Sequence, residues 1–296
     1  MVAQPYSSLP TPIAVPVLPS PGSLICRCSP RHPRFSPPMA HKNTIEKEFQ
    51  LNTDETVVVT GVTSGIGLAC ARKLIEQGNK VIGIGRRTER LNALGDELGE
   101  RFYPLNCDVR DIDSLNTQLK QLPDAFATIS KLINSAGLLQ GQGTLLEVSD
   151  AQISTMLETN VHGLINVTRA VLPKLIESGC GHIINLTSIG AHYHYAGGHV
   201  YAASKAFVDH FGQCLRTELV GSRVRLTNIA PGKTRSEFAL VQFAGDQARA
   251  DRVYSTLTPL EPMDVANSIL WALHQPTHVN INLIELMPAD QELSYR

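Results

Sequence analysis

Short apolar runs alternate with longer amphipathic stretches from about residue 53 onward. The strand-like runs are apolar throughout, which is typical of parallel strands covered by helices on both faces. We therefore expect one α/β domain over residues 51–296, doubly wound around a parallel sheet of about seven strands. The expected strands lie within 55–60, 80–85, 101–109, 129–137, 181–188, 223–232 and 280–286, and the expected helices within 67–78, 87–99, 111–122, 150–178, 201–219 and 262–275.

The first 38 residues break this pattern, and we expect residues 1–50 to form a disordered, proline-rich tail. Ten of the eighteen prolines precede Met39, and the first acidic residue of the chain is Glu46. Proline disrupts helices and sheet ladders, and the segment has too little periodic apolar surface to fold. Three interpretations stay open: a disordered tail, a targeting peptide, or an artefact of a start codon placed too early, with Met39 as the alternative start.

The composition is that of an ordinary globular protein and argues against several classes of function. Hydrophobic residues make up 43% and charged residues 18%. The formal net charge of -1 provides no basic field for nucleic acid or an anionic membrane. No apolar run approaches the roughly 20 residues of a membrane-spanning helix. The six cysteines include no CxxC pair, so we expect reduced thiols, no metal and a cytoplasmic location.

A glycine-rich turn, TGVTSGIG (60–67), lies between the first expected strand and the first expected helix. Gly61 permits the tight turn, and Gly65 and Gly67 let the backbone and the helix approach a ligand closely. The helix N-terminus then offers unpaired N–H groups and a positive dipole to a pyrophosphate. In this strand-turn-helix context the glycines predict a Rossmann-type dinucleotide site.

The residues after the second expected strand indicate which nicotinamide cofactor binds. NAD-binding proteins usually carry Asp or Glu there, to accept a hydrogen bond from the ribose 2′-hydroxyl. This chain has Gly85, Arg86 and Arg87 instead. A carboxylate would repel a 2′-phosphate, whereas a guanidinium binds one bidentately. We therefore expect NADP as cofactor, with two arginines that merely cap a surface turn as the alternative.

The spacing GxxxGxG, preceded by Thr60, resembles that of the short-chain dehydrogenase/reductase family. The resemblance covers about residues 54–290. The pair Asp108 and Val109 resembles the family's adenine-contacting pair, and NSAG (134–137) resembles its NNAG motif. The resemblance implies an oxidoreductase acting on CH–OH or C=O groups. The expected cofactor-binding residues are Gly61, Thr63, Ser64, Gly65, Ile66, Gly67, Arg86, Arg87, Asp108, Val109, Asn134, Ala136, Gly137, Tyr201, Lys205, Pro231, Gly232 and Thr234.

Ser188, Tyr201 and Lys205 stand at the family's catalytic spacing, and Asn160 matches its fourth catalytic residue. Tyr201 and Lys205 are four residues apart, so on a helix they share one face. A free tyrosine, with a pKa near ~10, is a poor base at neutral pH, and a nearby ammonium favours the phenolate. The resemblance implies Tyr201 as general acid/base and Ser188 as donor to the substrate oxygen. It also implies Lys205 as a holder of the nicotinamide ribose and Asn160 as the residue that orders a relay water.

Histidines and tyrosines crowd the segment just before Tyr201, in SIGAHYHYAGGHV (188–200). The spacing of His192 and His194 lacks a third ligand on a helix or strand, which argues against a metal site. Two interpretations stay open for them: substrate-pocket lining, or exposed loop residues. His182 opens an expected strand, so we expect a structural role for it.

Several stretches narrow the resemblance to the NADP-dependent 3-hydroxy acid dehydrogenases, among them YAGGHVYAASKAFV and THVNINLIELMP. This group implies short 3-hydroxy acids, or the matching 3-oxo acids and semialdehydes, as substrates. It also implies a homotetramer. Two alternatives remain: an NADP-dependent carbonyl reductase of another small substrate, and a catalytically idle NADP-binding regulator.

The segment that follows Pro231 and Gly232 departs from the group's pattern. Its spacer before the Ser-Glu-Phe triplet, in PGKTRSEF, is one residue shorter than usual, so either Thr234 or Ser236 is expected to reach the nicotinamide carboxamide. We expect residues 236–255 to form a mobile lid over the substrate. Arg235, Arg249 and Arg252 are candidates for binding the substrate carboxylate. The alternative for each is a charged side chain of the lid that is exposed to solvent.

Overall fold

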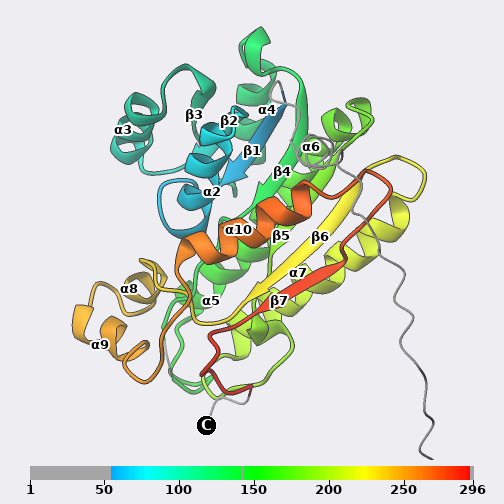
Figure 1. Cartoon of the computed structure of the whole chain (residues 1–296). Coiled ribbons are helices and arrows are strands. Elements are labelled where there is room, and N and C mark those ends of the chain that lie inside the picture. Colours follow the sequence, from blue (N-terminus) through cyan, green and yellow to red (C-terminus); the bar gives the residue numbers. More distant parts are fainter. Residues whose placement is uncertain (1–54, 142, 294–296) are drawn as a thin grey trace, which may run out of the picture. The chain divides into compact units, whose positions relative to one another are not determined.

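The part of the chain that the computed structural model describes, residues 55–141 and 143–293, is built around one parallel sheet (Figure 1). Its strand order is β3-β2-β1-β4-β5-β6-β7, which confirms the expected doubly wound α/β fold with seven strands. The expectations for the proline-rich segment and for Met39 fall outside the described residues. The strands are β1 (Thr56–Thr60), β2 (Lys80–Gly85), β3 (Phe102–Asn106), β4 (Ile129–Asn134), β5 (His182–Leu186), β6 (Arg225–Pro231) and β7 (Leu283–Leu286).

Helices cover both faces of this sheet (Figure 1). On one face lie α2 (Gly65–Glu76), α3 (Thr88–Leu98) and α10 (Pro262–Leu273). On the other lie α4 (Ile112–Lys120), α6 (Leu164–Glu177) and α7 (His199–Glu218). The remaining helical segments are η1 (Gly99–Arg101), η2 (Asp124–Phe126), α5 (Asp150–Leu157), η3 (Glu158–Gly163), η4 (Ile189–Ala191), α8 (Phe238–Gln242) and α9 (Gln247–Arg252).

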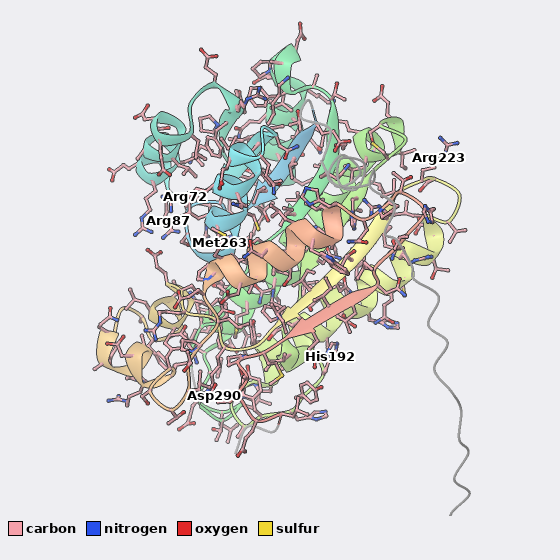
Figure 2. All side chains as sticks on the ribbon, in the orientation of Figure 1. Arg72, Arg87, His192, Arg223, Met263 and Asp290 are labelled. Atoms are coloured by element: carbon pink, nitrogen blue, oxygen red, sulfur yellow. The ribbon has the colours of Figure 1, made fainter. Side chains whose placement is uncertain are left out.

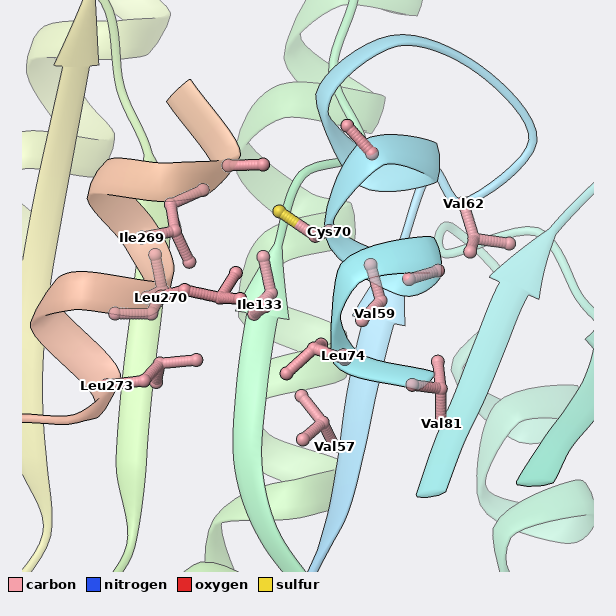
Figure 3. Close-up of a cluster of buried hydrophobic side chains, with 14 of the residues drawn as sticks. Val57, Val59, Val62, Cys70, Leu74, Val81, Ile133, Ile269, Leu270 and Leu273 are labelled. Carbon is pink, nitrogen blue, oxygen red and sulfur yellow. The ribbon is translucent and has the colours of Figure 1, made fainter. Parts of the chain in front are cut away.

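The central strand β1 explains why its sequence is apolar without alternation. Val57 and Val59 belong to the apolar cluster that also contains residues of α2 and α10, and Figure 3 shows them beside Leu74 of α2. Val58, between them, points to the opposite face and its separate apolar cluster. Successive strand residues face opposite sides of a sheet, so a strand covered on both sides needs apolar residues at every position.

The helical stretch expected over 150–178 is not one uniform α-helix. It consists of α5, the six-residue π-helix η3, and α6. Such wide turns occur frequently at functional sites, and this one contains the buried Asn160.

The strand order places a crevice at the carboxyl ends of the central strands. Strands β2 and β3 lie on one side of β1, and β4 to β7 follow on the other. Because the connections leave in opposite directions at this point, the segments after β1 and β4 diverge and leave room for a ligand.

Within the described ranges, no helix has the length and apolarity needed to cross a membrane.

Candidate active site

A cavity of about 700 Å³ opens at the carboxyl ends of the strands. The glycine-rich turn after β1, the segments after β2, β4, β5 and β6, and the start of α7 contribute to it. Segment 236–255 around α8, which the sequence predicts to be a lid and which is called the lid below, contributes as well. The fold thus brings together most of the residues that the sequence predicts. Those that line the cavity are Gly61, Thr63, Ser64, Gly65, Ile66, Arg86, Arg87, Val109, Ala136, Gly137, Ser188, Tyr201, Lys205, Pro231, Gly232 and Thr234.

The glycine-rich turn has the geometry that a phosphate cradle requires. Gly61 and Gly65 have φ values of 66° and 56°, in the left-handed region that favours glycine. A Cβ on Gly61 would lie 3.0 Å from the backbone of Ala136, so a side chain there would press on the segment after β4. The N-cap Ser64 makes no side-chain capping hydrogen bond. The first N–H groups of α2 therefore have no side-chain cap from Ser64, and Gly65 and Ile66 line the cavity, which fits a pyrophosphate.

Gly67 lies behind the cavity rather than in its lining. A Cβ at this position would lie 2.6 Å from the carbonyl oxygen of Gly61. Its function in the structure is therefore to let α2 pack directly against the turn.

Asp108 and Asn134 also lie outside the cavity lining, because each is held by other polar groups. Asp108 accepts from the side chain and backbone of Arg110. Burial raises the pKa of Asp108, but the Arg110 hydrogen bonds and the charge of Arg86 outweigh this effect and lower it. Asn134 donates to Thr168 on α6 and to Asn185 on β5, at 3.0 Å each.

The two arginines after β2 line the cavity in different surroundings. The Nε and Nη2 groups of Arg87 donate to Thr63 Oγ1 at 3.0 and 2.8 Å, and Nη2 donates to Ser64 Oγ at 2.8 Å. Arg86 has a contact of 3.5 Å to Asp108 and is half exposed. Together they make this end of the cavity cationic, which fits a 2′-phosphate.

Tyr201 and Lys205 share the cavity face of α7. The Lys205 Nζ lies 6.0 Å from the centroid of the Tyr201 ring and donates to the carbonyl oxygen of Leu186 at 2.8 Å. Burial lowers the pKa of Lys205 to about 8. The ammonium therefore persists at neutral pH, next to the ring whose phenolate it would stabilise.

Ser188 caps the short helix η4 at the end of β5. Its Oγ accepts from the backbone N–H of Gly190 at 3.0 Å, which leaves the hydroxyl proton available as a donor. The Tyr195 ring packs so closely on Gly198 that a Cβ there would lie 2.2 Å from it. Tyr195 and Ser188 line the same cavity.

Asn160 lies between the segment after β4 and helix α7, and it does not line the cavity. Its Oδ1 accepts from Leu138 N at 2.8 Å, and its Nδ2 donates to Leu138 O at 2.9 Å and to Ser204 Oγ at 3.0 Å. This amide joins the segment after β4 to α7. The relay-water role stays a prediction.

The histidines before Tyr201 do not line the cavity, so the pocket-lining interpretation is wrong. His192 Nδ1 lies 2.8 Å from Glu285 Oε2, and Tyr193 donates to the same carboxylate. His182 is buried, with Nε2 2.9 Å from Thr227 Oγ1, as expected of a structural residue. Among the described residues, no group of three or more His, Cys, Asp or Glu side chains could hold a metal.

The lid arginines lie outside the cavity lining as well. Arg235 lies 3.4 Å from Glu261 and over the Tyr254 ring, and Arg249 lies over the Phe243 ring. Lys233 lines the cavity instead, and Thr234 and Ser236 both do so. No local sequence pattern indicates Lys233, because its position depends on how the segment after β6 turns. Other lining residues that sequence reasoning missed are Leu138, Leu139, Tyr195, Glu237, Phe238 and Tyr254.

Comparisons with known proteins agree with this geometry. The family model for short chain dehydrogenase matches residues 55–245. The chain is 44% identical to serine 3-dehydrogenase of Agrobacterium fabrum, over 81% of this chain and 96% of that protein. It is also 44% identical to the NADP-dependent 3-hydroxy acid dehydrogenase of Escherichia coli, over 79% and 95%. The sulfoacetaldehyde reductase 2 of Chromohalobacter salexigens is equally similar, at 44% over 81% and 96%.

A solved structure matches over the same region. The closed form of serine dehydrogenase complexed with NADP+ superposes with a TM-score of 0.79 at 44% identity, over 80% of this chain and 96% of that one. The family match, the close relatives and the seven-stranded fold all agree. This chain belongs to the short chain dehydrogenase family.

Proposed function

We propose that this protein transfers a hydride between NADP(H) and the C3 carbon of a short 3-hydroxy acid, or of the matching 3-oxo acid or semialdehyde. The observation that carries the proposal is the convergence of Ser188, Tyr201 and Lys205 with the glycine-rich turn in one cavity. The relatives named as NADP-dependent and serine dehydrogenases support the cofactor and the substrate class.

The chain's own residues would bind, orient and exchange a proton. The glycine-rich turn and the start of α2 would bind the pyrophosphate, and an arginine after β2 would bind the 2′-phosphate. NADP(H), when bound, supplies or accepts the hydride. In alcohol oxidation the Tyr201 oxygen takes the hydroxyl proton, and in carbonyl reduction it donates that proton back. Ser188 donates to the substrate oxygen, and the Lys205 ammonium stabilises the Tyr201 phenolate.

The substrate end of the cavity is built to exclude water. Leu138 and Leu139 are buried beside Tyr201, and the ring of Phe238 lies 5.6 Å from the Tyr201 ring, edge to face. Among the basic side chains near the substrate end, Lys233 lines the cavity, whereas Arg235, Arg249 and Arg252 do not. We therefore propose that the Lys233 side chain binds the carboxylate of the substrate.

The test follows nicotinamide absorbance on the purified protein with NADP+ and with NAD+. The alcohols are L-serine, L-allo-threonine and 3-hydroxypropionate, and the carbonyls are malonic semialdehyde and sulfoacetaldehyde. We expect turnover with NADP(H) on at least one 3-hydroxy acid or its carbonyl. Turnover on sulfoacetaldehyde alone would favour a carbonyl reductase of another small substrate. NADPH binding without turnover on any compound would favour the idle binder.

The assembly and location belong to the same proposal. Phe207 on α7 is exposed and stacks on Phe211, and Trp271 on α10 is about half exposed. Such surfaces fit contacts between copies, and we propose a homotetramer, measurable by light scattering as four times the 32.2 kDa chain. The four cysteines within the described ranges are free thiols, which fits the proposed cytoplasmic location.

A further inference from the structure

Glu237 stands at the start of the lid and pairs with two arginines across the cavity mouth. Its Oε2 lies 2.7 Å from Arg87 Nη1, and both of its oxygens lie 2.6 to 2.8 Å from Arg90 Nη1. Glu237 immediately precedes α8, whereas Arg87 and Arg90 flank the start of α3. The ion pairs therefore join segments about 150 residues apart. In Figure 2, Arg87 lies on the side of the domain where α3 approaches the lid helices.

The donors of Arg87 are nearly all engaged in this arrangement. Its Nε and Nη2 groups hold Thr63 and Ser64 of the glycine-rich turn, and Nη1 holds Glu237. A guanidinium has five N–H donors, so little capacity is left for a further anion. Arg86, with one long contact to Asp108, retains donors for a 2′-phosphate. Arg86 therefore has more N–H donors left for an anion than Arg87 has.

The lid also meets the rest of the domain at further points: the Tyr254 hydroxyl donates to the carbonyl oxygen of Thr234 at 3.0 Å. Phe238 packs edge to face on Tyr201, and the carbonyl oxygen of Gln242 accepts from Gly141 N at 3.2 Å. The lid also has its own small apolar cluster around Ala239, Phe243 and Ala250. The lid therefore has packing of its own, and the Glu237 ion pair joins it to Arg87 at the cofactor end of the cavity.

We propose that Glu237 is a positioning residue: through Arg87 it fastens the closed lid to the glycine-rich turn, and through Arg90 to α3, while Arg86 binds the 2′-phosphate. The inference rests on the proposed function, because it assigns the cavity to NADP. It makes lid closure and cofactor binding mutually dependent. The ionic contacts are half exposed, so their loss weakens the lid without unfolding the domain.

The experiment compares Glu237→Gln with Arg90→Gln, their double variant, and Glu97→Gln as matched control. Glu97 makes a similar surface pair with Arg72, at 2.7 and 2.9 Å, away from the cavity lining. Dissociation constants for NADP+ and NAD+ are measured by fluorescence, and hydrogen exchange of lid amides 238–255 is followed with and without NADP+. Neither readout needs turnover, so both stay informative if none of the tested substrates reacts.

We expect Glu237→Gln to raise both dissociation constants by a similar factor of roughly three to ten. Lid exchange should accelerate, NADP+ should protect the lid less, and Arg90→Gln should add little to the effect of Glu237→Gln. Glu237→Asp should restore part of the protection, and Glu97→Gln should match the wild type. Tighter NADP+ binding by Glu237→Gln would show that the carboxylate competes with the phosphate. Tighter binding of NADP+, weaker binding of NADP+ but not of NAD+, or unchanged hydrogen exchange of the lid amides would each overturn the proposal.

Discussion

At the scale of single residues, Lys205 shows how the fold gives a side chain its chemistry. The four-residue spacing from Tyr201 places both side chains on one helix face. The carbonyl of Leu186, at the end of β5, and the burial that lowers the pKa of Lys205 to about 8 come from packing. Local spacing predicts the pair, and the tertiary environment sets its protonation.

The proton transfer assigned to Tyr201 can be tested by removing one oxygen. Tyr201→Phe should abolish turnover, because no other group in the assignment exchanges the proton, while NADPH affinity and melting temperature stay near those of the wild type. Steady-state kinetics and NADPH fluorescence measure the two properties separately. Substantial residual turnover would show that the proton moves by another route.

The cofactor preference can be tested at Arg86. Arg86→Asp should weaken NADP+ binding and shift the preference toward NAD+, because a carboxylate repels the 2′-phosphate and accepts from a ribose hydroxyl. The ratio of kcat/KM for the two cofactors measures the shift. An unchanged NADP+ preference would exclude Arg86 as the phosphate-binding residue.

At the scale of elements, the junction of β1, the glycine-rich turn and α2 sets the position of the end of the cavity that binds the cofactor. Thr60 Oγ1, at the end of β1, accepts from the N–H groups of Ser135 and Ala136 at 3.0 and 2.9 Å. These bonds hold the segment after β4 against the turn. The crevice thus depends on two strands far apart in sequence.

Gly67 provides a test of this junction. Gly67→Ala should destabilise the fold by about 1–3 kcal/mol, because its Cβ would lie 2.6 Å from the Gly61 oxygen and α2 would have to shift. Cofactor affinity should fall with it. The matched control is Gly95→Ala in α3, whose Cβ would meet Pro104 at an ordinary 3.7 Å. That change should leave stability equal or slightly higher, since alanine favours helix. Urea unfolding measures both, and equal results would contradict the packing argument.

At the scale of the whole molecule, buried charges gather at the amino ends of the strands, away from the cavity. Lys131 pairs with Glu55 at 2.8 Å, and Arg225 donates to carbonyl oxygens after α10. Burial, with the charges of Arg225 and Lys131, holds the pKa of His182 well below its usual 6.5. His182 is therefore neutral in the folded chain.

This neutral histidine gives stability a pH dependence of known sign. The unfolded chain takes up a proton below about pH 6.5 and the folded chain does not, so the contribution of His182 is fully present above that pH and is lost as the pH falls. The free energy of unfolding should decrease between about pH 7 and 5.5. His182→Gln should make this decrease shallower. Parallel slopes for variant and wild type would assign the dependence to other groups.

The proline-rich segment is tested at the same scale. We expect deletion of residues 1–38 to leave activity and melting temperature unchanged, because the segment has too little periodic apolar surface to join a core. Activity assays and calorimetry of both lengths measure this. A large loss of either would show that the segment is part of the fold.

The sequence by itself determined the fold class, the seven strands, the glycine-rich turn and the spacing of Ser188, Tyr201 and Lys205. These depend on local periodicity and on residues close together in the chain, where few conformations compete. It did not predict that Asn160 and Gly67 lie behind the cavity instead of lining it. It also did not predict that Tyr195 lines the cavity while the neighbouring histidines do not, or that Lys233 lines it while the lid arginines do not.

Only the tertiary structure decided these points and the pairing of Glu237 with Arg87 and Arg90. Contacts between segments about 150 residues apart depend on how strands and lid pack together. No local pattern encodes them, because the partners meet only after the sheet has ordered its strands.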